Sequence, residues 1–378
     1  MKKIFVWAVI LAAFLVACSG NGEVADVADE VMNFAEVIEV PEVDAVSNIE
    51  LQTAANVGTA YLFGEIHGNE LYLNVQLSLW RDFYNEGMRH MFVELPFFGA
   101  EWLNLWMQAD DDDILDNFFA SFRGTALDNP YSRNFLLAIK EEFPETIFHG
   151  TDIGHGYSTL GVAFLEYLRE NGLAGSEQYE LTLENIEQGR KFYGELNMSH
   201  EFRVESMLQN FIRAFEELGE SIMSGFYGGA HVMFGYYHPN WGGGPTLATR
   251  LREIYGDNIV AVLINDILEG IIEFPTKIMT INGREYVATF LGSSDMRSFS
   301  TVFVYRQFWR IEGAYEDFAE NPLNGNVLPF DNFPVPVEVG QVFAILYTRV
   351  DGTTEWHHMR SSGRIWQGRP ITEQFLIE

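Results

Sequence analysis

Residues 61–69 constrain the possible fold more than any other stretch of the chain. The apolar, aromatic run at 61–63 is typical of a buried strand. Glu65 and His67 follow with one residue between them, so in an extended chain both side chains leave from the same face. A turn at 68–69 leads into a segment with helical spacing. A carboxylate and an imidazole at the C-terminal end of a strand lie where open α/β sheets bind their ligands.

A strand-helix-strand pattern follows this opening. Asn69 is a suitable cap for a helix that runs to about Glu86, and the next strand spans Met91 to Pro96. Glu94 near the end of that strand comes 29 residues after Glu65, the length of one strand-helix-strand unit. We therefore expect two adjacent parallel strands with a carboxylate at the same end of each.

Later strands repeat the arrangement. The third strand, at 146–149, runs into Asp152, which is either a site residue or only a loop-forming one. The fourth, at 222–227, enters a Gly-x-x-His segment that ends at His231 and has the same spacing as the one that ends at His67. Glycine before each histidine lets a ligand approach the backbone closely.

These elements predict an α/β fold with a mostly parallel central sheet, flanked by helices, and a site at the C-terminal ends of its strands. We assign this domain to residues 51–275. Beyond Pro275 the chain changes to short alternating runs separated by turns rich in proline and glycine. Residues 276–378 are therefore predicted to form a β-rich C-terminal portion.

The N-terminus has the features of a targeting segment. Two lysines precede the apolar run from Ile4 to Val16, which is too short for a membrane span of ~20 residues. The run ends in Leu-Val-Ala-Cys, which resembles a bacterial lipobox. This resemblance implies a signal peptide at 1–17, lipidation of Cys18 and an acidic tether at 18–50. Cys18 is the only cysteine of the chain, so no disulfide stabilises the mature fold.

The charge balance limits the classes of partner. A net charge of −31 opposes binding to nucleic acid and to a membrane through basic patches. It suits a domain that a lipid anchor holds at the membrane, facing outside the cytoplasm. The expected partners are thus the membrane, through the anchor at Cys18, and a small-molecule or peptide substrate.

The predicted site contains Glu65, His67, Glu94, Asp152 and His231. The chain has no Gly-x-Ser-x-Gly motif and no cysteine outside the lipobox, which excludes the commonest covalent hydrolases. Histidines and carboxylates can instead activate water. Either His67 is the general base, oriented by a carboxylate, or His67, His231 and a carboxylate hold a divalent metal that acidifies bound water. Both options lead to hydrolysis, and the residues alone do not choose between them.

Several segments together resemble the erythromycin-esterase-like proteins. They are Gly-Glu-Ile-His-Gly at 64–68, Val-Glu at 93–94, Gly-Thr-Asp at 150–152, and the stretch from His231 through the strand at 258–260. The segment 203–210 is similar to the Arg-Asp-x-x-Met-x-x-Asn helix of that family, with glutamate in place of aspartate. The wider superfamily includes the ChaN haem-uptake proteins and the TraB/Tiki proteins, which carry two Gly-x-x-His motifs and a glutamate.

The resemblance implies an ester or amide hydrolase in which His67 is the base, Glu65 and Glu94 orient it and the water, and His231 completes the site. The esterases carry a His-Asn-x-His element where this chain has Gly-Gly-Ala-His, which argues against macrolides as the substrate. Two alternatives follow from the wider superfamily. One is a Tiki-like metallopeptidase with a divalent metal, and the other is a ChaN-like lipoprotein that binds haem, the less favoured cofactor, without turnover.

Overall fold

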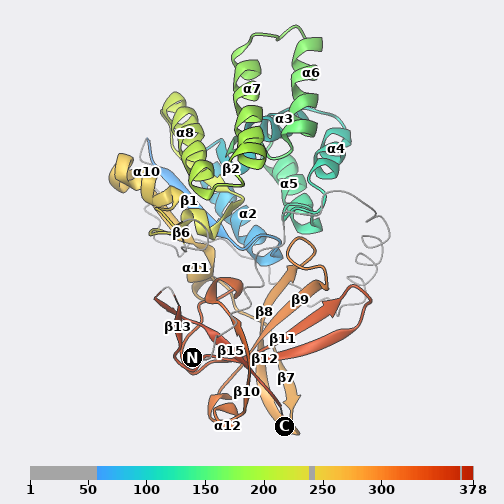
Figure 1. Cartoon of the computed structure of the whole chain (residues 1–378), viewed down its shortest axis with the longest axis vertical. Helices are drawn as coiled ribbons and strands as arrows, with labels where there is room; N and C mark the ends of the chain where they lie inside the picture. The colour runs from blue at the N-terminus through green and yellow to red at the C-terminus, as the bar shows by residue number, and fades with distance from the viewer. Residues whose placement is uncertain (1–57, 238–242, 367, 378) are drawn as a thin grey trace.

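A computed structural model of the protein describes residues 58–237, 243–366 and 368–377. Two sheets of different kinds form its framework (Figure 1). The first sheet is parallel and carries helices on both faces. Its strands are β1 (Ala60–Glu65), β2 (His90–Pro96), β3 (Ile147–Asp152), β4 (Ile222–Gly225), β5 (Tyr227–Gly228) and β6 (Ile259–Leu263). The prediction of a mostly parallel central sheet flanked by helices is confirmed.

The strand order is β3-β2-β4-β1, with β5 continuing beside β1 and β6 pairing with the other side of β1. Our prediction that β1 and β2 are adjacent is wrong, because β4 lies between them and pairs with both. Met223 of β4 is the register partner of Tyr61 on one side and of Met91 on the other. The ends of β1, β2 and the β4–β5 segment therefore converge at one edge of the sheet.

Alternate residues of β1 belong to two different cores, as the two-residue period of a strand requires. Tyr61 and Phe63 pack in a core with α2, α3 and α5, whereas Ala60 and Leu62 pack with α8 and α10 on the opposite face. The helices are α2 (Glu70–Asn85), α3 (Phe97–Met107), α4 (Asp113–Ser121), α5 (Pro130–Glu142), α6 (Val162–Glu170), α7 (Glu177–Arg190), α8 (His200–Leu218), α9 (Gly229–Val232), α10 (Leu247–Tyr255) and α11 (Ile264–Ile271). Two π-helical turns, η1 (Tyr157–Gly161) and η2 (Lys191–Glu195), adjoin α6 and α7.

Asparagine caps begin two of these helices, and the cap at Asn69 is the one predicted above. The side chain of Asn69 accepts a hydrogen bond from the backbone N–H of Tyr72 at the start of α2. Asn129 accepts one from Ser132 at the start of α5, where Pro130 takes the first helical position.

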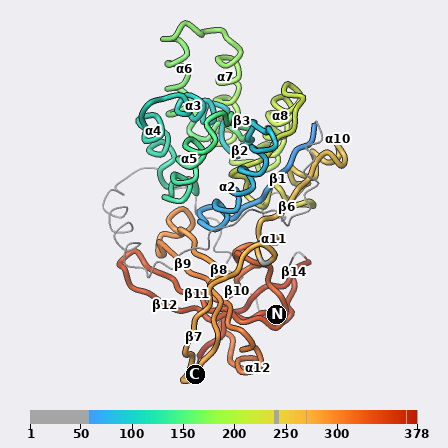
Figure 2. The backbone as a smooth tube through the Cα atoms, turned by 180° about the vertical axis from the view of Figure 1, so that it is seen from behind, coloured from blue at the N-terminus to red at the C-terminus, as the bar shows by residue number. Residues whose placement is uncertain are grey.

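The second sheet is antiparallel and is built from the C-terminal part of the chain (Figure 2). In spatial order its strands are β10 (Leu323–Leu328), β15 (Thr372–Phe375), β12 (Thr354–Arg360), β11 (Val342–Arg349), β9 (Phe303–Ile311), β8 (Arg284–Asp295) and β7 (Thr276–Ile281). A small hairpin, β13 (Ile365–Trp366) with β14 (Arg369–Pro370), the short helix α12 (Tyr315–Phe318), and the 3₁₀ turns η4 (Gly256–Asn258) and η5 (Phe330–Asn332) complete the elements. The β-rich character predicted for this portion agrees with the structure.

The two sheets share one hydrophobic core. Phe308 of β9 and Phe343 of β11 belong to the same buried cluster as α2 and the face of β1 that bears Phe63. The end of β8 also reaches the loop after β1, where the Asp295 N–H donates to the carbonyl of Gly68 (3.1 Å). Asn69 and Ser294 form an isolated antiparallel bridge at the same place. The second sheet thus supports the loop that carries His67.

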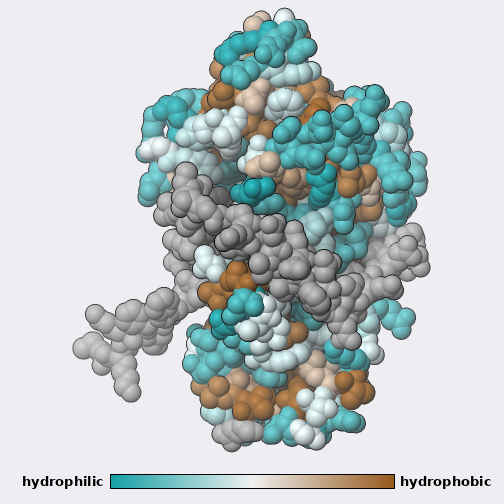
Figure 3. Space-filling view, turned by 90° about the vertical axis from the view of Figure 1, so that its right-hand side faces the viewer, coloured by the Kyte–Doolittle hydropathy of each residue, from teal (hydrophilic) through white to brown (hydrophobic). Residues whose placement is uncertain are grey.

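The surface is mainly hydrophilic over the helices of the first sheet and more mixed over the second sheet, as the visible face in Figure 3 shows. No helix in the part of the chain that the structure describes is both long and apolar enough to span a bilayer. The predicted signal peptide at 1–17, the lipidation site Cys18 and the tether at 18–50 lie outside the described residues. The predicted domain limits therefore stay predictions.

Candidate active site

The two Gly-x-x-His segments lie side by side at the edge where the strands of the first sheet end. Gly64 and Glu65 of β1 pair in parallel with Tyr227 and Gly228 of β5. A Cβ atom on Gly64 would lie only 2.8 Å from the Cα atom of Gly229, so the close approach of the two segments requires glycine there. This pairing places His67 and His231 at the same edge of the sheet, which we call the rim.

Glu65 and His67 form a carboxylate-imidazole pair. The Nδ1 atom of His67 lies 2.8 Å from Oε1 of Glu65 and donates to it, which leaves Nε2 as the free ring nitrogen. The other oxygen of Glu65 accepts a short hydrogen bond from the side-chain amide of Gln76 on α2. The Glu65 side chain is 3% exposed and that of His67 is 31% exposed. The carboxylate is therefore fixed, while the imidazole remains accessible.

The surroundings of His67 favour its protonated form. Burial opposes the charged imidazolium, but the hydrogen bond to Glu65 and the negative charge of Glu94 outweigh burial and raise the pKa of His67 to about 9. The ring is thus protonated at neutral pH before a substrate binds. It becomes a proton acceptor as the pH approaches 9.

Glu94, on β2, is held at both oxygens. One, Oε2, accepts from the backbone N–H of Gly228 (2.6 Å), and Oε1 accepts from the Arg203 guanidinium (2.6 Å). Nε2 of His231 lies 3.2 Å from Oε1. Burial favours the neutral acid, but His231 and Arg203 hold the pKa of the Glu94 carboxyl below its usual range. Glu94 is therefore a fixed carboxylate.

A narrow wedge separates His67 from Glu94. The free Nε2 of His67 lies 3.7 Å from Oε2 of Glu94, a separation at which one water can contact both atoms. Gly228 forms the floor of this wedge, because a Cβ atom there would lie 2.8 Å from His67 Nε2 and 3.4 Å from Glu94 Oε2. The glycine keeps the wedge open.

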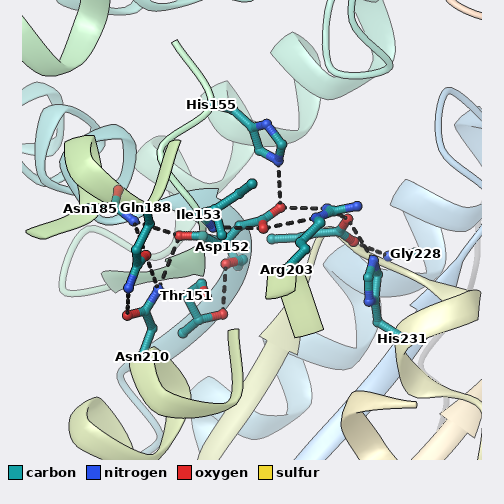
Figure 4. Close-up of polar contacts among 12 residues, drawn as sticks. Thr151, Asp152, Ile153, His155, Asn185, Gln188, Arg203, Asn210, Gly228 and His231 are labelled. Atoms are coloured by element: carbon teal, nitrogen blue, oxygen red, sulfur yellow. Dashed lines mark hydrogen bonds and ion pairs between the residues drawn. The ribbon is translucent and has the colours of Figure 1, made fainter. Parts of the chain in front are cut away.

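Asp152, at the end of β3, binds Arg203 through both of its oxygens. Arg203 donates from Nε to Oδ1 (3.0 Å) and from Nη2 to Oδ2 (2.5 Å), and Nε2 of His155 lies 3.1 Å from Oδ2 (Figure 4). Burial favours the protonated acid, yet Arg203 and His155 hold the pKa of Asp152 well below its usual range. Arg203 on α8 thus joins the carboxylates of β2 and β3.

His231 has both ring nitrogens engaged. Nδ1 lies 2.7 Å from the hydroxyl of Tyr237, whose oxygen also accepts from the backbone of Leu247, so the hydroxyl proton points to His231. The remaining Nε2–H donates to Glu94. His200 packs edge-on against Tyr237, with ring centroids 4.0 Å apart, and burial lowers the pKa of His200 to about 4. The hydrogen bonds of His231 therefore fix the position of the Glu94 carboxylate.

The structure brings all five predicted residues, Glu65, His67, Glu94, Asp152 and His231, to one rim. Sequence reasoning did not assign Arg203 a function, although Arg203 connects Glu94 with Asp152. Its only signal was the resemblance of segment 203–210, in which Asn210 also contacts the backbone of β3. Glu205, compared there with the family aspartate, instead lies on the surface and contacts Gln209 and Arg250.

The described residues of this rim do not form a metal-binding cluster, and they offer haem a single histidine nitrogen. Among them, no group of three or more His, Cys, Asp and Glu side chains is placed to hold a metal ion. Arg203 lies within 2.6 Å of both Glu94 and Asp152 and takes the position of a cation between these carboxylates. His231 has no free nitrogen to serve as an axial ligand of haem, so of the two rim histidines only His67 could do so, through Nε2.

No family model matches the chain, and no curated protein shows significant sequence similarity to it. Three solved structures are remotely similar. A Bacillus cereus protein is 12% identical, with a TM-score of 0.44 over 69% of this chain and 78% of its own. An erythromycin esterase variant in an open conformation is 13% identical, with a TM-score of 0.39 over 61% and 76%. A succinoglycan biosynthesis protein is 13% identical, with a TM-score of 0.43 over 72% and 81%.

Proposed function

We propose that this protein is a hydrolase that activates a water molecule against an ester or amide, without a covalent enzyme intermediate. The observation that carries the proposal is the wedge between Nε2 of His67 and Oε2 of Glu94, which lie 3.7 Å apart over a glycine floor. A general base must lie within hydrogen-bonding reach of the proton that it removes. A water in the wedge meets this requirement for His67.

The proposed reaction needs only the described side chains, water and substrate. Neutral His67 accepts a proton at Nε2 as the water oxygen bonds to the substrate carbonyl carbon, and Glu65 stabilises the resulting imidazolium through Nδ1–H. His67 then returns this proton to the leaving oxygen or nitrogen as its bond to carbon breaks. Glu94 orients the water, and Arg203 and His231 keep Glu94 ionised and in place.

The substrate class follows from the site and from the motif resemblance. We propose a small-molecule or peptide ester or amide as the substrate, with esters to be tested first because the motifs resemble those of erythromycin-esterase-like proteins. The net charge of −31 supports a substrate other than nucleic acid. The lipobox-like sequence supports attachment to the membrane through a lipid on Cys18, with the site outside the cytoplasm.

The metallopeptidase has less support because Arg203 takes the position of a cation between Glu94 and Asp152. The haem-binding alternative has less support because only His67 offers a free ring nitrogen. Dialysis against a chelator is therefore expected to leave hydrolysis unchanged. A loss of activity that added metal restores would instead favour the metallopeptidase. A Soret band that appears on addition of haem and disappears in His67→Ala would favour the haem protein.

The direct test is turnover of a panel of esters and amides by the full-length lipidated chain in detergent. We expect ester hydrolysis that His67→Ala lowers about 10³-fold and that His357→Ala, a change on β12 of the second sheet, leaves intact. Circular dichroism and thermal melting should show both variants folded. A folded His67→Ala variant with full activity, or a panel without any turnover by the wild type, would overturn the proposal.

A further inference from the structure

Two tyrosines lie next to the polar rim on the two π-helical turns. Tyr157 begins η1 and Tyr193 lies within η2. Their rings are nearly parallel, at 26° with centroids 6.2 Å apart, and both residues are partly exposed. Such π-helical turns are rare and occur frequently at functional sites. The pair forms a small aromatic surface beside His155.

Glycine-to-glycine packing holds this surface in place. A Cβ atom on Gly189 of α7 would lie 2.1 Å from the carbonyl oxygen of Gly154, and one on Gly154 would lie 2.2 Å from the carbonyl oxygen of Asn185. Real Cβ atoms do not approach so closely, so both positions require glycine. This contact brings the end of α7, and with it η2, against the loop that carries His155.

A continuous polar chain connects the aromatic surface with the proposed catalytic centre. The hydroxyl of Tyr193 lies 2.6 Å from Nδ1 of His155, and Nε2 of His155 contacts Asp152. Asp152 binds Arg203, which in turn binds Glu94. Burial and the charge of Asp152 raise the pKa of Tyr193 to about 12, so its hydroxyl keeps its proton and donates it to His155.

We propose that Tyr157 and Tyr193 form a subsite that binds a ring of the substrate, either an aromatic ring or a saturated six-membered ring. This inference rests on the proposed hydrolase function. The chemistry shared by both ring types is a broad apolar face, a π face or a face of C–H bonds, that packs on the ring of tyrosine. Since the two tyrosines border the polar rim, they would select ring-bearing esters or amides over linear ones of equal size.

Binding without turnover tests the subsite separately from the hydrolase. Three amides have seven carbons each and serve as probes: benzamide, cyclohexanecarboxamide and heptanamide. We expect calorimetry or tyrosine NMR shifts to show at least about threefold tighter binding of the two ring amides to the full-length His67→Ala chain, in which the proposed mechanism allows no hydrolysis. Preference for benzamide alone would identify stacking of π faces, and equal preference for both rings would identify contact with apolar C–H faces.

Three variants sharpen the test. Tyr157→Ala should remove the ring preference, whereas Tyr193→Phe keeps the ring and should retain the preference while losing the bond to His155. Tyr315→Ala, on α12 of the second sheet, is the matched control and should bind as the wild type does. Equal affinity for all three amides, or a ring preference that survives in folded Tyr157→Ala, would overturn the subsite.

The two proposals fail in different ways. A chain that binds rings through Tyr157 but hydrolyses no ester would retain the subsite and contradict the hydrolase. A chain that hydrolyses benzoate, cyclohexanecarboxylate and heptanoate esters with equal kcat/KM would retain the hydrolase and contradict the subsite.

Discussion

Two segments have the same Gly-x-x-His spacing, but their histidines, His67 and His231, differ in exposure and in hydrogen bonding. His67 keeps one free ring nitrogen, is 31% exposed and has a pKa raised to about 9. His231 is 6% exposed and has both nitrogens engaged, by Tyr237 and Glu94. The spacing sets where each histidine lies, and its hydrogen-bond partners set its role. Glu65 precedes His67 where Gly229 precedes His231, so only His67 has a carboxylate beside it within its own motif.

Removal of each histidine in turn should separate the two roles and produce the largest effects. His67→Ala removes the proposed proton acceptor, and we expect kcat to fall about 10³-fold with little change in melting temperature. His231→Ala removes a positioning group, so kcat should fall less and the melting temperature should drop because Glu94 loses a buried partner. Steady-state kinetics with differential scanning calorimetry measures both. Equal losses of kcat in the two folded variants would contradict the assigned division of roles.

A methyl group placed between the two segments should have the next largest effect. Gly228→Ala sets a Cβ atom 2.8 Å from Nε2 of His67, so the imidazole must leave the wedge. We expect a loss of at least about 10²-fold in kcat/KM, since small displacements of reacting groups are costly. Gly270→Ala on α11, where no atom lies within 4 Å of the added methyl group, is the control. Wild-type activity in Gly228→Ala would show that the wedge is not the reaction site.

The pH dependence should distinguish His67 as a base from His67 as an acid. Below a pKa of about 9, the neutral fraction of His67 grows about tenfold per pH unit, so kcat/KM should rise with this slope and level off above pH 9. The free energy of unfolding should change in the opposite direction and decrease as the pH rises. The pKa of His67 is higher in the folded than in the unfolded state. Its stabilising contribution is therefore complete below a pH of about 6.5 and is lost as the pH rises through 9.

Urea titrations at several pH values, with His67→Gln as the reference, measure the stability change. The reference should lack the part of the pH dependence that lies between about 6.5 and 9. A decline of kcat/KM on passing pH 9 upward would assign His67 the role of proton donor instead.

Loss of one hydroxyl next to His231 should have the smallest effect. Tyr237→Phe removes the donor to His231 Nδ1 but keeps the ring against His200, so we expect a decrease in kcat of about tenfold or less and a stability loss of about 1 kcal/mol. Steady-state kinetics and urea titration measure the two effects. Wild-type kcat and stability in the variant would indicate that the Tyr237 hydroxyl does not position His231.

Local patterns predicted the first four strands and the helix capped by Asn69, because apolar runs and capping residues act over a few neighbouring positions. They also predicted the five rim residues, since each follows or ends such a run. The insertion of β4 between β1 and β2 was not predictable in this way, because the order of strands depends on packing between distant segments. Arg203 was missed for the same reason. Its burial is tolerated only because Glu94 and Asp152, on two other elements, meet its charge.

The contact between β8 and the loop after β1 has a consequence for the timing of synthesis. The carbonyl of Gly68 is bonded by the N–H of Asp295, and Asn69 pairs with Ser294, more than two hundred residues later in the chain. A nascent chain that already contains His67, Glu94, Asp152 and His231 therefore still lacks the bonds that settle the His67 loop. We therefore expect the His67 loop to reach its final conformation only after β8 has been synthesised, when most of the chain is already made.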